Sequence, residues 1–216
     1  DSVFTAITIK NPTYVPAYIW IANTYVKMDP DTKLGLAKPK FEKVIDVAKS
    51  DSVKNASQMM DALVYLSYYN MMNDNFSKSK DYYNRMINLS PGNKEYKIKG
   101  YNGIGSVELR SISGEKTNEG RLPYLSRATD AYNKILALDP MNNSAKSQLN
   151  YIHEFEAAIK KGINPNEIKG IITNAAGLPI AYASIRVKDT AAKNLSNAKG
   201  TYKFEIPEVT EVLILR

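Results

Sequence analysis

The stretch "DALVYLSYYNMMNDNFSKSKDYYNRMINLSP", residues 61–91, decides the fold of most of the chain. Its first half places apolar and small residues three and four positions apart, up to a polar turn at residues 73–75. Its second half carries another such stripe, which ends at Pro91. Residues at this spacing share one face of a helix, and proline cannot extend the helical hydrogen-bond ladder. The stretch therefore predicts two amphipathic helices joined by a short turn.

The second half of this stretch recurs along the chain. In each copy an aromatic residue precedes a proline by eight positions. The three pairs are Phe4 with Pro12, Tyr83 with Pro91, and Tyr132 with Pro140. A small residue, Ser79 or Ala128, lies four positions before two of these aromatics, where it allows a neighbouring helix to approach closely. The fixed interval indicates a repeated structural unit.

The repeated unit resembles the tetratricopeptide repeat, which pairs a helix A with a helix B. Residues 60–91 match its pattern at Leu63, Leu66, Ser67, Phe76, Ser79, Tyr83, Met86 and Pro91. An earlier unit is predicted at residues 13–28 and 37–49, joined by an enlarged turn, "DPDTKLG", and a later unit begins with a helix at 94–111. The resemblance implies an α-α superhelical solenoid over residues 1–162.

The ends of this array depart from the repeat. A polar insertion, "SISGEKTNEGRLP", is predicted as a loop before Tyr124. The stretch "NNSAKSQLNYIHEFEAAIKKG" predicts one more helix, from Asn143 or Ser144 to Gly162, which we interpret as a capping helix because a solenoid end must hide its apolar face. The first twelve residues match only the second half of a unit, so we expect this sequence to begin within a longer array of repeats.

From Ile163 onward the pattern changes to period-two runs, "IKGIIT", "ASIRV", "TYKFEI" and "EVLIL", separated by Asn, Gly, Pro and Asp. Such runs predict short β-strands. Gly177 suits a turn that needs a positive φ, and Tyr202, Phe204 and Ile206 alternate onto one face. The sequence therefore predicts a small β domain after a linker, "INPNE".

The order of residues in this part resembles the carboxypeptidase-regulatory-like module, a transthyretin-type β-sandwich. The matching positions are Gly170, Gly177, Pro179, Ala183, Gly200, Tyr202, Phe204 and Pro207. The resemblance implies a small antiparallel β-sandwich at residues 167–216, shortened or truncated because the module usually continues for further strands. The predicted fold class is thus α+β and multi-domain, a helical solenoid followed by a β-sandwich.

The composition excludes several kinds of chemistry. The chain has no cysteine, which rules out disulfides, thiolate metal sites and a catalytic thiol, and His153 is its only histidine. One histidine does not build a zinc site or a catalytic triad, so we predict no enzyme, no catalytic residue, no metal and no cofactor. The glycine-rich "GYNGIG" does not follow a strand, which argues against a phosphate-binding loop.

Charge and hydropathy restrict the kinds of partner that we expect. The formal charge of +7 is scattered, with no basic run longer than residues 160–161, so we predict a solvated basic surface and no nucleic-acid interface. No apolar run reaches the roughly 18 to 20 residues that span a bilayer, which predicts no membrane span, and the first residues do not form a signal peptide.

The repeat resemblance also implies a binding groove. In tetratricopeptide arrays the A helices face the concave surface, and the position after the small residue and those one turn away point into it. Carried onto this sequence, the groove residues are Asn23, Lys27, Tyr68, Met71, Asn102, Ser106, Arg110 and Tyr151. For each of them an ordinary solvated or packed residue is the alternative interpretation.

Three functional hypotheses follow. The first is a non-enzymatic scaffold that binds a protein or peptide in the groove, and the repeat pattern motivates it. The pairing of the two resemblances is similar to that in envelope proteins of certain Gram-negative bacteria, which implies a periplasmic or outer-membrane-associated location and an envelope component as partner. The second is a glycan-binding accessory protein in nutrient capture. The third is an accessory fragment of a longer enzyme whose catalytic domain lies outside these residues.

Overall fold

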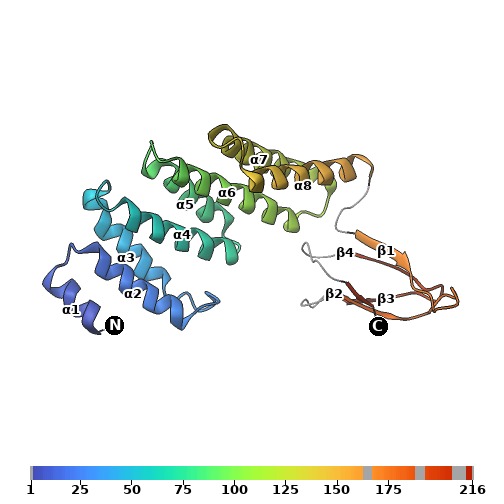
Figure 1. The fold of residues 1–216 in the computed structure, drawn as a ribbon. Coiled ribbons are helices and arrows are strands. Elements are labelled where there is room, and N and C mark those ends of the chain that lie inside the picture. Colours follow the sequence, from blue (N-terminus) through green and yellow to red (C-terminus); the bar gives the residue numbers. More distant parts are fainter. Residues whose placement is uncertain (1, 163–166, 188–192, 206–212, 216) are drawn as a thin grey trace. The chain divides into compact units, whose positions relative to one another are not determined.

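The computed structural model describes residues 2–162, 167–187, 193–205 and 213–215. Within these residues the fold is α+β, with eight α-helices and five short β-strands (Figure 1). The chain divides into two compact units, one of residues Asp1–Ile112 and Pro123–Leu149, the other of Ser113–Leu122 and Asn150–Arg216. The predicted boundary between residues 162 and 167 stays a prediction.

The helices follow one another with short connections. They are α1 (Ser2–Lys10), α2 (Val15–Met28), α3 (Lys38–Ala48), α4 (Ala56–Met72), α5 (Phe76–Leu89), α6 (Lys94–Ser111), α7 (Asn118–Leu138) and α8 (Asn143–Lys160). The predicted helix pairs of the first and second units correspond to α2 with α3 and α4 with α5. The helices at 94–111 and after Pro140 are confirmed as α6 and α8.

In the compact unit that contains residues 1–112, each helix from α1 through α6 packs against its neighbours in sequence. In addition, α4 packs against both α2 and α6, so the alternate helices α2, α4 and α6 form a row. A continuous core joins these layers, with fully buried Val44, Leu63, Leu66 and Met86. The described helices are thus compatible with a helical repeat, and the superhelical solenoid stays a prediction.

The segment "GYNGIG" lies inside α6, where its glycines receive the side chains of neighbouring helices. A Cβ at Gly103 would overlap the Tyr83 ring of α5, and a Cβ at Gly105 would overlap the Tyr132 ring of α7. Residues two apart point to nearly opposite sides of a helix. These glycines therefore let one tyrosine pack on each side of α6, which explains them without a phosphate-binding role.

The enlarged turn "DPDTKLG" after α2 is confirmed, and Asp29 organises it. The Asp29 carboxylate is buried and accepts hydrogen bonds from the backbone N–H of Leu34 at 3.2 Å and of Leu36 at 3.3 Å. Thr32 and Gly35 take positive φ values of 56° and 67°. Both oxygens of this carboxylate thus stabilise the turn.

The predicted loop before Tyr124 is wrong for its second half. A 3₁₀ turn covers Ile112–Gly114, and α7 already begins at Asn118, with Pro123 inside it. Thr117 caps this helix, since its Oγ1 accepts from the N–H of Gly120 at 3.0 Å. Pro123 removes one helical hydrogen bond, and α7 nevertheless continues past it to Leu138.

The described strands form two small antiparallel sheets. The strands are β1 (Glu167–Ile171), β2 (Ser184–Val187), β3 (Lys193–Leu195), β4 (Thr201–Glu205) and β5 (Leu213–Leu215). One sheet pairs β1 with β4, and the other has the order β3-β2-β5. All four predicted runs therefore carry a strand, whereas β3 was not predicted. The β-sandwich itself stays a prediction.

Local contacts define this β part. Gly177 has a φ of +79°, as its predicted turn requires. The buried Ser196 hydroxyl accepts from the N–H of Ala183 at 2.9 Å and donates to the carbonyl of Ile180 at 2.8 Å. The Asn194 side chain donates to the carbonyl of Lys203 at 2.8 Å, which links the two sheets. The predicted face partner Ile206 lies outside the described residues.

Candidate binding surfaces of the helical unit

Seven of the eight predicted groove residues lie on the row formed by α2, α4 and α6. They are Asn23 and Lys27 on α2, Tyr68 and Met71 on α4, and Asn102, Ser106 and Arg110 on α6. All seven are exposed or half-buried. The structure therefore places these seven on three neighbouring helices.

Tyr151, the eighth predicted groove residue, lies on the part of α8 that belongs to the second unit. It is half-buried and packs edge-on against Phe155, with ring centroids 5.9 Å apart. Burial raises the pKa of its hydroxyl. Within its own unit Tyr151 thus has the properties of a packing residue.

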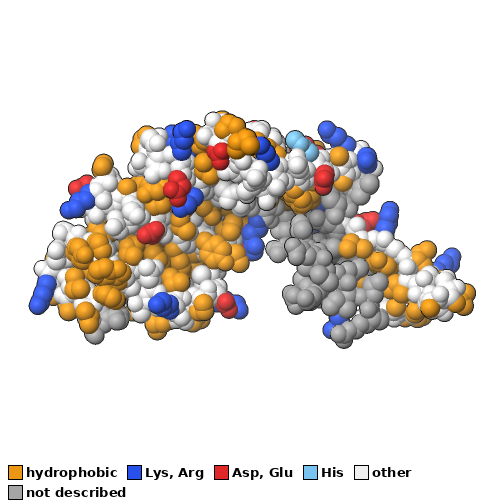
Figure 2. All heavy atoms as spheres, viewed as in Figure 1, with side chains coloured by type: hydrophobic (Ala, Val, Ile, Leu, Met, Phe, Trp, Pro, Cys, Tyr) orange, Lys and Arg blue, Asp and Glu red, His pale blue; other side chains and the backbone are white. Residues whose placement is uncertain are grey.

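An exposed apolar stripe runs along α4. Val64 and Tyr68 are each 44% exposed and Met72 is 40% exposed. These residues are four positions apart and therefore share one face of the helix. In Figure 2, hydrophobic side chains gather over α2 and α4 on the visible face. We call Val64, Tyr68 and Met72 the α4 stripe.

The sequence interpretation included only Tyr68 of the α4 stripe. Val64 and Met72 were not among the predicted groove residues, because those residues were carried over from the repeat pattern alone. A signal was present in the spacing, since Leu63 and Leu66 define the buried face and Val64 lies about 100° from Leu63. An apolar residue off the buried face is a candidate for contact with a partner.

Polar groups flank the α4 stripe on both neighbouring helices. Lys27 of α2 is exposed, and Arg110 of α6 pairs through Nε with Asp74 at 3.4 Å, just beyond the end of α4. The Ser106 hydroxyl donates to the Asn102 carbonyl at 2.9 Å, so its hydrogen bond is made within α6. The row therefore combines an apolar centre with charged edges.

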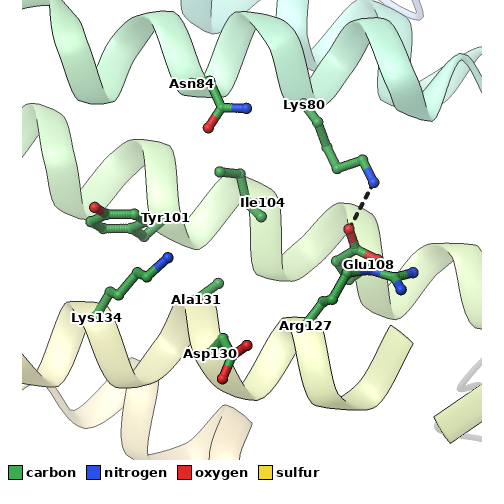
Figure 3. A pocket seen from close by; sticks show the side chains of 9 residues that line it. All are labelled: Lys80, Asn84, Tyr101, Ile104, Glu108, Arg127, Asp130, Ala131 and Lys134. Carbon is green, nitrogen blue, oxygen red and sulfur yellow. Dashed lines mark hydrogen bonds and ion pairs between the residues drawn. The ribbon is translucent and has the colours of Figure 1, made fainter. Parts of the chain in front are cut away.

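A second feature of this unit is a pocket of about 270 Å³ between α5, α6 and α7 (Figure 3). Its lining residues are Lys80 and Asn84 of α5, Tyr101, Ile104 and Glu108 of α6, and Arg127, Asp130, Ala131 and Lys134 of α7. Asn84, Asp130 and Lys134 are exposed, so the pocket opens to solvent. Its volume is just below the roughly 300 Å³ at which typical ligand pockets begin.

Glu108 is the buried anion of this pocket. Its side chain is 2% exposed, and its two oxygens accept from Lys80 Nζ and from Arg127 Nε, each at 2.8 Å. Burying a carboxylate costs several kcal/mol unless charges and hydrogen bonds compensate it. Two cations from two different helices provide this compensation, so Glu108 fixes α5 and α7 to α6.

The other end of the pocket is aromatic and basic. Lys134 Nζ lies 5.5 Å from the centroid of the Tyr101 ring, a cation–π arrangement. At the Glu108 end, Arg127 stacks on Tyr124, with its Cζ 4.5 Å from the ring centroid. Between the two ends Ile104 and Ala131 supply apolar lining (Figure 3). The pocket thus has an apolar middle and a cation at each end.

None of the predicted groove residues lines this pocket. The pocket uses Tyr101, Ile104 and Glu108 of α6, whereas the predicted residues of α6 start at Asn102 and lie on another face. A signal for it was present, because Glu108 occupies a position between Ile104 and the buried Ile112 at intervals of four. A carboxylate within a buried stripe predicts a compensated charge.

The residues that the structure describes contain no group of three or more His, Cys, Asp or Glu side chains that could hold a metal ion. No described helix combines the length and the hydropathy needed to cross a bilayer. Comparison of the chain with protein-family models, with curated proteins and with solved structures found no match.

Proposed function

We propose that the helical unit is a non-enzymatic binding module of the tetratricopeptide type, which holds a protein or peptide segment on the row of α2, α4 and α6. The α4 stripe is the observation that carries this proposal. Three apolar side chains that are 40 to 44% exposed retain area that a partner can cover. Covering them contributes about 1 kcal/mol for each side chain.

The extent of the stripe favours a polypeptide over a small molecule. Val64 and Met72 are separated by two helical turns, which correspond to about 12 Å along α4. The predicted groove residues extend the surface onto both neighbouring helices. A segment of several residues can contact such a surface along its length, whereas a compact ligand covers only part of it.

The flanking charges define the partner further. Lys27 lies on one side of the stripe and the Arg110–Asp74 pair on the other, within a chain of formal charge +7. A partner segment with apolar anchors and adjacent acidic residues is complementary to this arrangement. We therefore propose that the partner segment is apolar and is flanked by Asp or Glu.

A site-specific cross-linking experiment tests the docking surface. A photoreactive amino acid replaces Tyr68 in the whole chain, and cross-linked products from bacterial envelope extracts are mapped by mass spectrometry. We expect a product attached at position 68 that is lost in a Val64→Ala/Met72→Ala background. The matched control is Leu34→Ala/Val53→Ala, which shortens two exposed apolar residues of the same unit outside the row.

Two outcomes of this experiment count against the proposal. One is the absence of any cross-link at position 68 under conditions where the photoreactive group is activated. The other is a product whose yield falls equally in the stripe variant and in the control variant. The envelope location belongs to the same proposal and rests on the resemblance alone, so cell fractionation with detection of the native chain tests it separately.

Tyr182 favours glycan binding by the β part as a second candidate function. Its side chain is 68% exposed, and its φ of 58° is uncommon for a residue with a side chain. The exposed Leu178 lies close by in sequence. Exposed rings on constrained backbone occur at ligand sites. A glycan array comparing the chain with Tyr182→Ala tests this: equal signals from both proteins remove the candidate.

A further inference from the structure

The pocket between α5, α6 and α7 has a charge that indicates its ligand. Lys80, Arg127 and Lys134 supply three positive charges, and Glu108 and Asp130 supply two negative ones, which leaves an excess of one positive charge. The pocket lies between α5, α6 and α7, whereas the α4 stripe lies on α4 and contributes no lining residue. Binding in the pocket is therefore independent of the proposed docking function.

Both carboxylate oxygens of Glu108 are paired with protein groups, and these ion pairs hold Lys80 and Arg127 in place. Both of its oxygens are occupied by Lys80 and Arg127 at 2.8 Å, so the carboxylate holds these side chains at the pocket wall. An ammonium has three N–H donors and a guanidinium has five, and Glu108 uses one from each. The remaining donors can serve a ligand without further ordering of the side chains, which lowers the cost of binding.

Lys134 is the cation of the pocket that does not pair with Glu108. Its ammonium lies over the Tyr101 ring, and no ion pair of Lys134 is found in the described part of the chain. An aromatic face attracts a cation more weakly than a carboxylate does in a partly desolvated site. An incoming carboxylate can therefore pair with Lys134, while the exposed Asn84 amide offers a neutral donor from the opposite wall.

The middle of the pocket accommodates an apolar body. Ile104 is half-buried and Ala131 is buried, and both line the space between the charged ends. A volume of about 270 Å³ suits a ring or a short alkyl chain with one polar group. With Asp130 at the rim, the pocket has only one excess positive charge, so a ligand with two negative charges is disfavoured.

We propose that this pocket binds a singly charged organic carboxylate with a short apolar body, its carboxylate paired with Lys134 and its body against Ile104 and Ala131. The carboxylate can belong to a free small acid or to the C-terminus of a chain with an apolar last residue. Both sources share the same recognition chemistry, and the ligands tested below distinguish them.

Methyl-detected NMR titration of the whole chain tests this proposal. Benzoate is compared with benzamide, its neutral analogue of similar shape, while the methyl signals of Ile104 and Ala131 are followed. N-acetylphenylalanine and its amide form a second pair that represents a chain terminus. We expect saturable shifts with the two carboxylates in the millimolar range and a dissociation constant about tenfold larger for each neutral analogue.

Lys134→Gln is the test variant, because this exposed side chain can be replaced without opening the Glu108 cluster. Lys78→Gln on α5 is the matched control, since it removes the same charge from an exposed lysine outside the pocket. We expect about tenfold weaker benzoate binding for Lys134→Gln and unchanged binding for Lys78→Gln. Circular dichroism of both variants serves as the control that they remain helical.

Each result of these titrations either supports or overturns the proposal. Saturable binding of both carboxylates supports the proposal and includes chain termini as ligands, while binding of benzoate alone supports it for free acids. Equal affinity for carboxylate and amide overturns it, because the pocket would then be an apolar hollow. Equal weakening by Lys134→Gln and Lys78→Gln also overturns it, since general charge would explain the effect, and so does the absence of saturable shifts.

Discussion

Substitution of Gly105 by alanine should destabilise the helical unit through a single added methyl group. A Cβ at this position would lie 2.6 Å from Cζ and 2.7 Å from Cε2 of the Tyr132 ring, whereas ordinary van der Waals contact begins at 3.4 Å. The overlap is about 0.8 Å at its worst point. Tyr132 is 1% exposed, so the surrounding protein has to accommodate any shift of its ring.

Two opposing contributions set the magnitude. Inserting a methyl group into a packed core costs about 1 to 3 kcal/mol, and a buried ring places this case near the upper value. Replacing glycine by alanine inside a helix gains about 1 kcal/mol. The free energy of unfolding should therefore fall by about 2 kcal/mol, which lowers the melting temperature by about 4 to 8 °C in a chain of this size.

Thermal and urea unfolding, followed by circular dichroism at 222 nm, measures this loss. Gly92→Ala is the control, because its Cβ would meet no atom within 4 Å and should leave the stability nearly unchanged. In a Tyr132→Leu background, Gly105→Ala should become neutral or stabilising, since the ring is gone. Wild-type stability of Gly105→Ala, or an equal loss in both backgrounds, would refute the packing argument.

Three further predictions concern buried polar groups. Glu108→Ala should lower the free energy of unfolding by about 1 to 3 kcal/mol in urea titrations, whereas the same change at Glu95, an exposed partner of a helical ion pair, should cost less than about 0.5 kcal/mol. Burial raises the pKa of Tyr65 to about 12, so the folded state keeps a proton that the unfolded chain loses near pH 10. Stability should decline from pH 10 to 12, and Tyr65→Phe should reduce that decline and add about 1 kcal/mol at pH 7, because the hydroxyl is buried without a hydrogen-bond partner among the described residues. Ser196→Ala should speed amide hydrogen exchange at Ala183 about tenfold or more in NMR measurements, and an unchanged rate there would contradict its bridging role.

Much of the helical part was predictable because its signals are local. Apolar spacing, the polar turn at residues 73–75 and the proline after α5 all act within one or two helical turns. They predict the end of α4 and the position of α5 correctly, whereas α4 begins at Ala56, before the predicted stretch. The start of α7 was not predicted, since the polar insertion before Tyr124 was interpreted as a loop and the cap at Thr117 was not considered. Strand β3 is three residues long, too short for a period-two pattern to show.

The partners of Glu108 in the pocket could not be predicted from local sequence patterns, for a different reason. The central ion pairs of the pocket join Glu108 to Lys80, 28 positions earlier, and to Arg127, 19 positions later. No helical or strand period relates residues at these separations, so only the packing of three helices brings them together. The row of α2, α4 and α6 was accessible from the repeat pattern, whereas the exposure of Val64 and Met72 needed the packed structure.

The two tyrosines that pack on α6 also determine where this chain tolerates changes of length. Tyr83 and Tyr132 approach α6 from two sides at Gly103 and Gly105. An inserted residue between the start of α6 and Gly103 rotates both glycines by about 100° and places larger side chains beneath the rings. Natural length variation among relatives should therefore avoid the first half of α6 and concentrate in the connection after Ser111, so an alignment of such relatives would show gaps in that connection and none between Lys94 and Gly105.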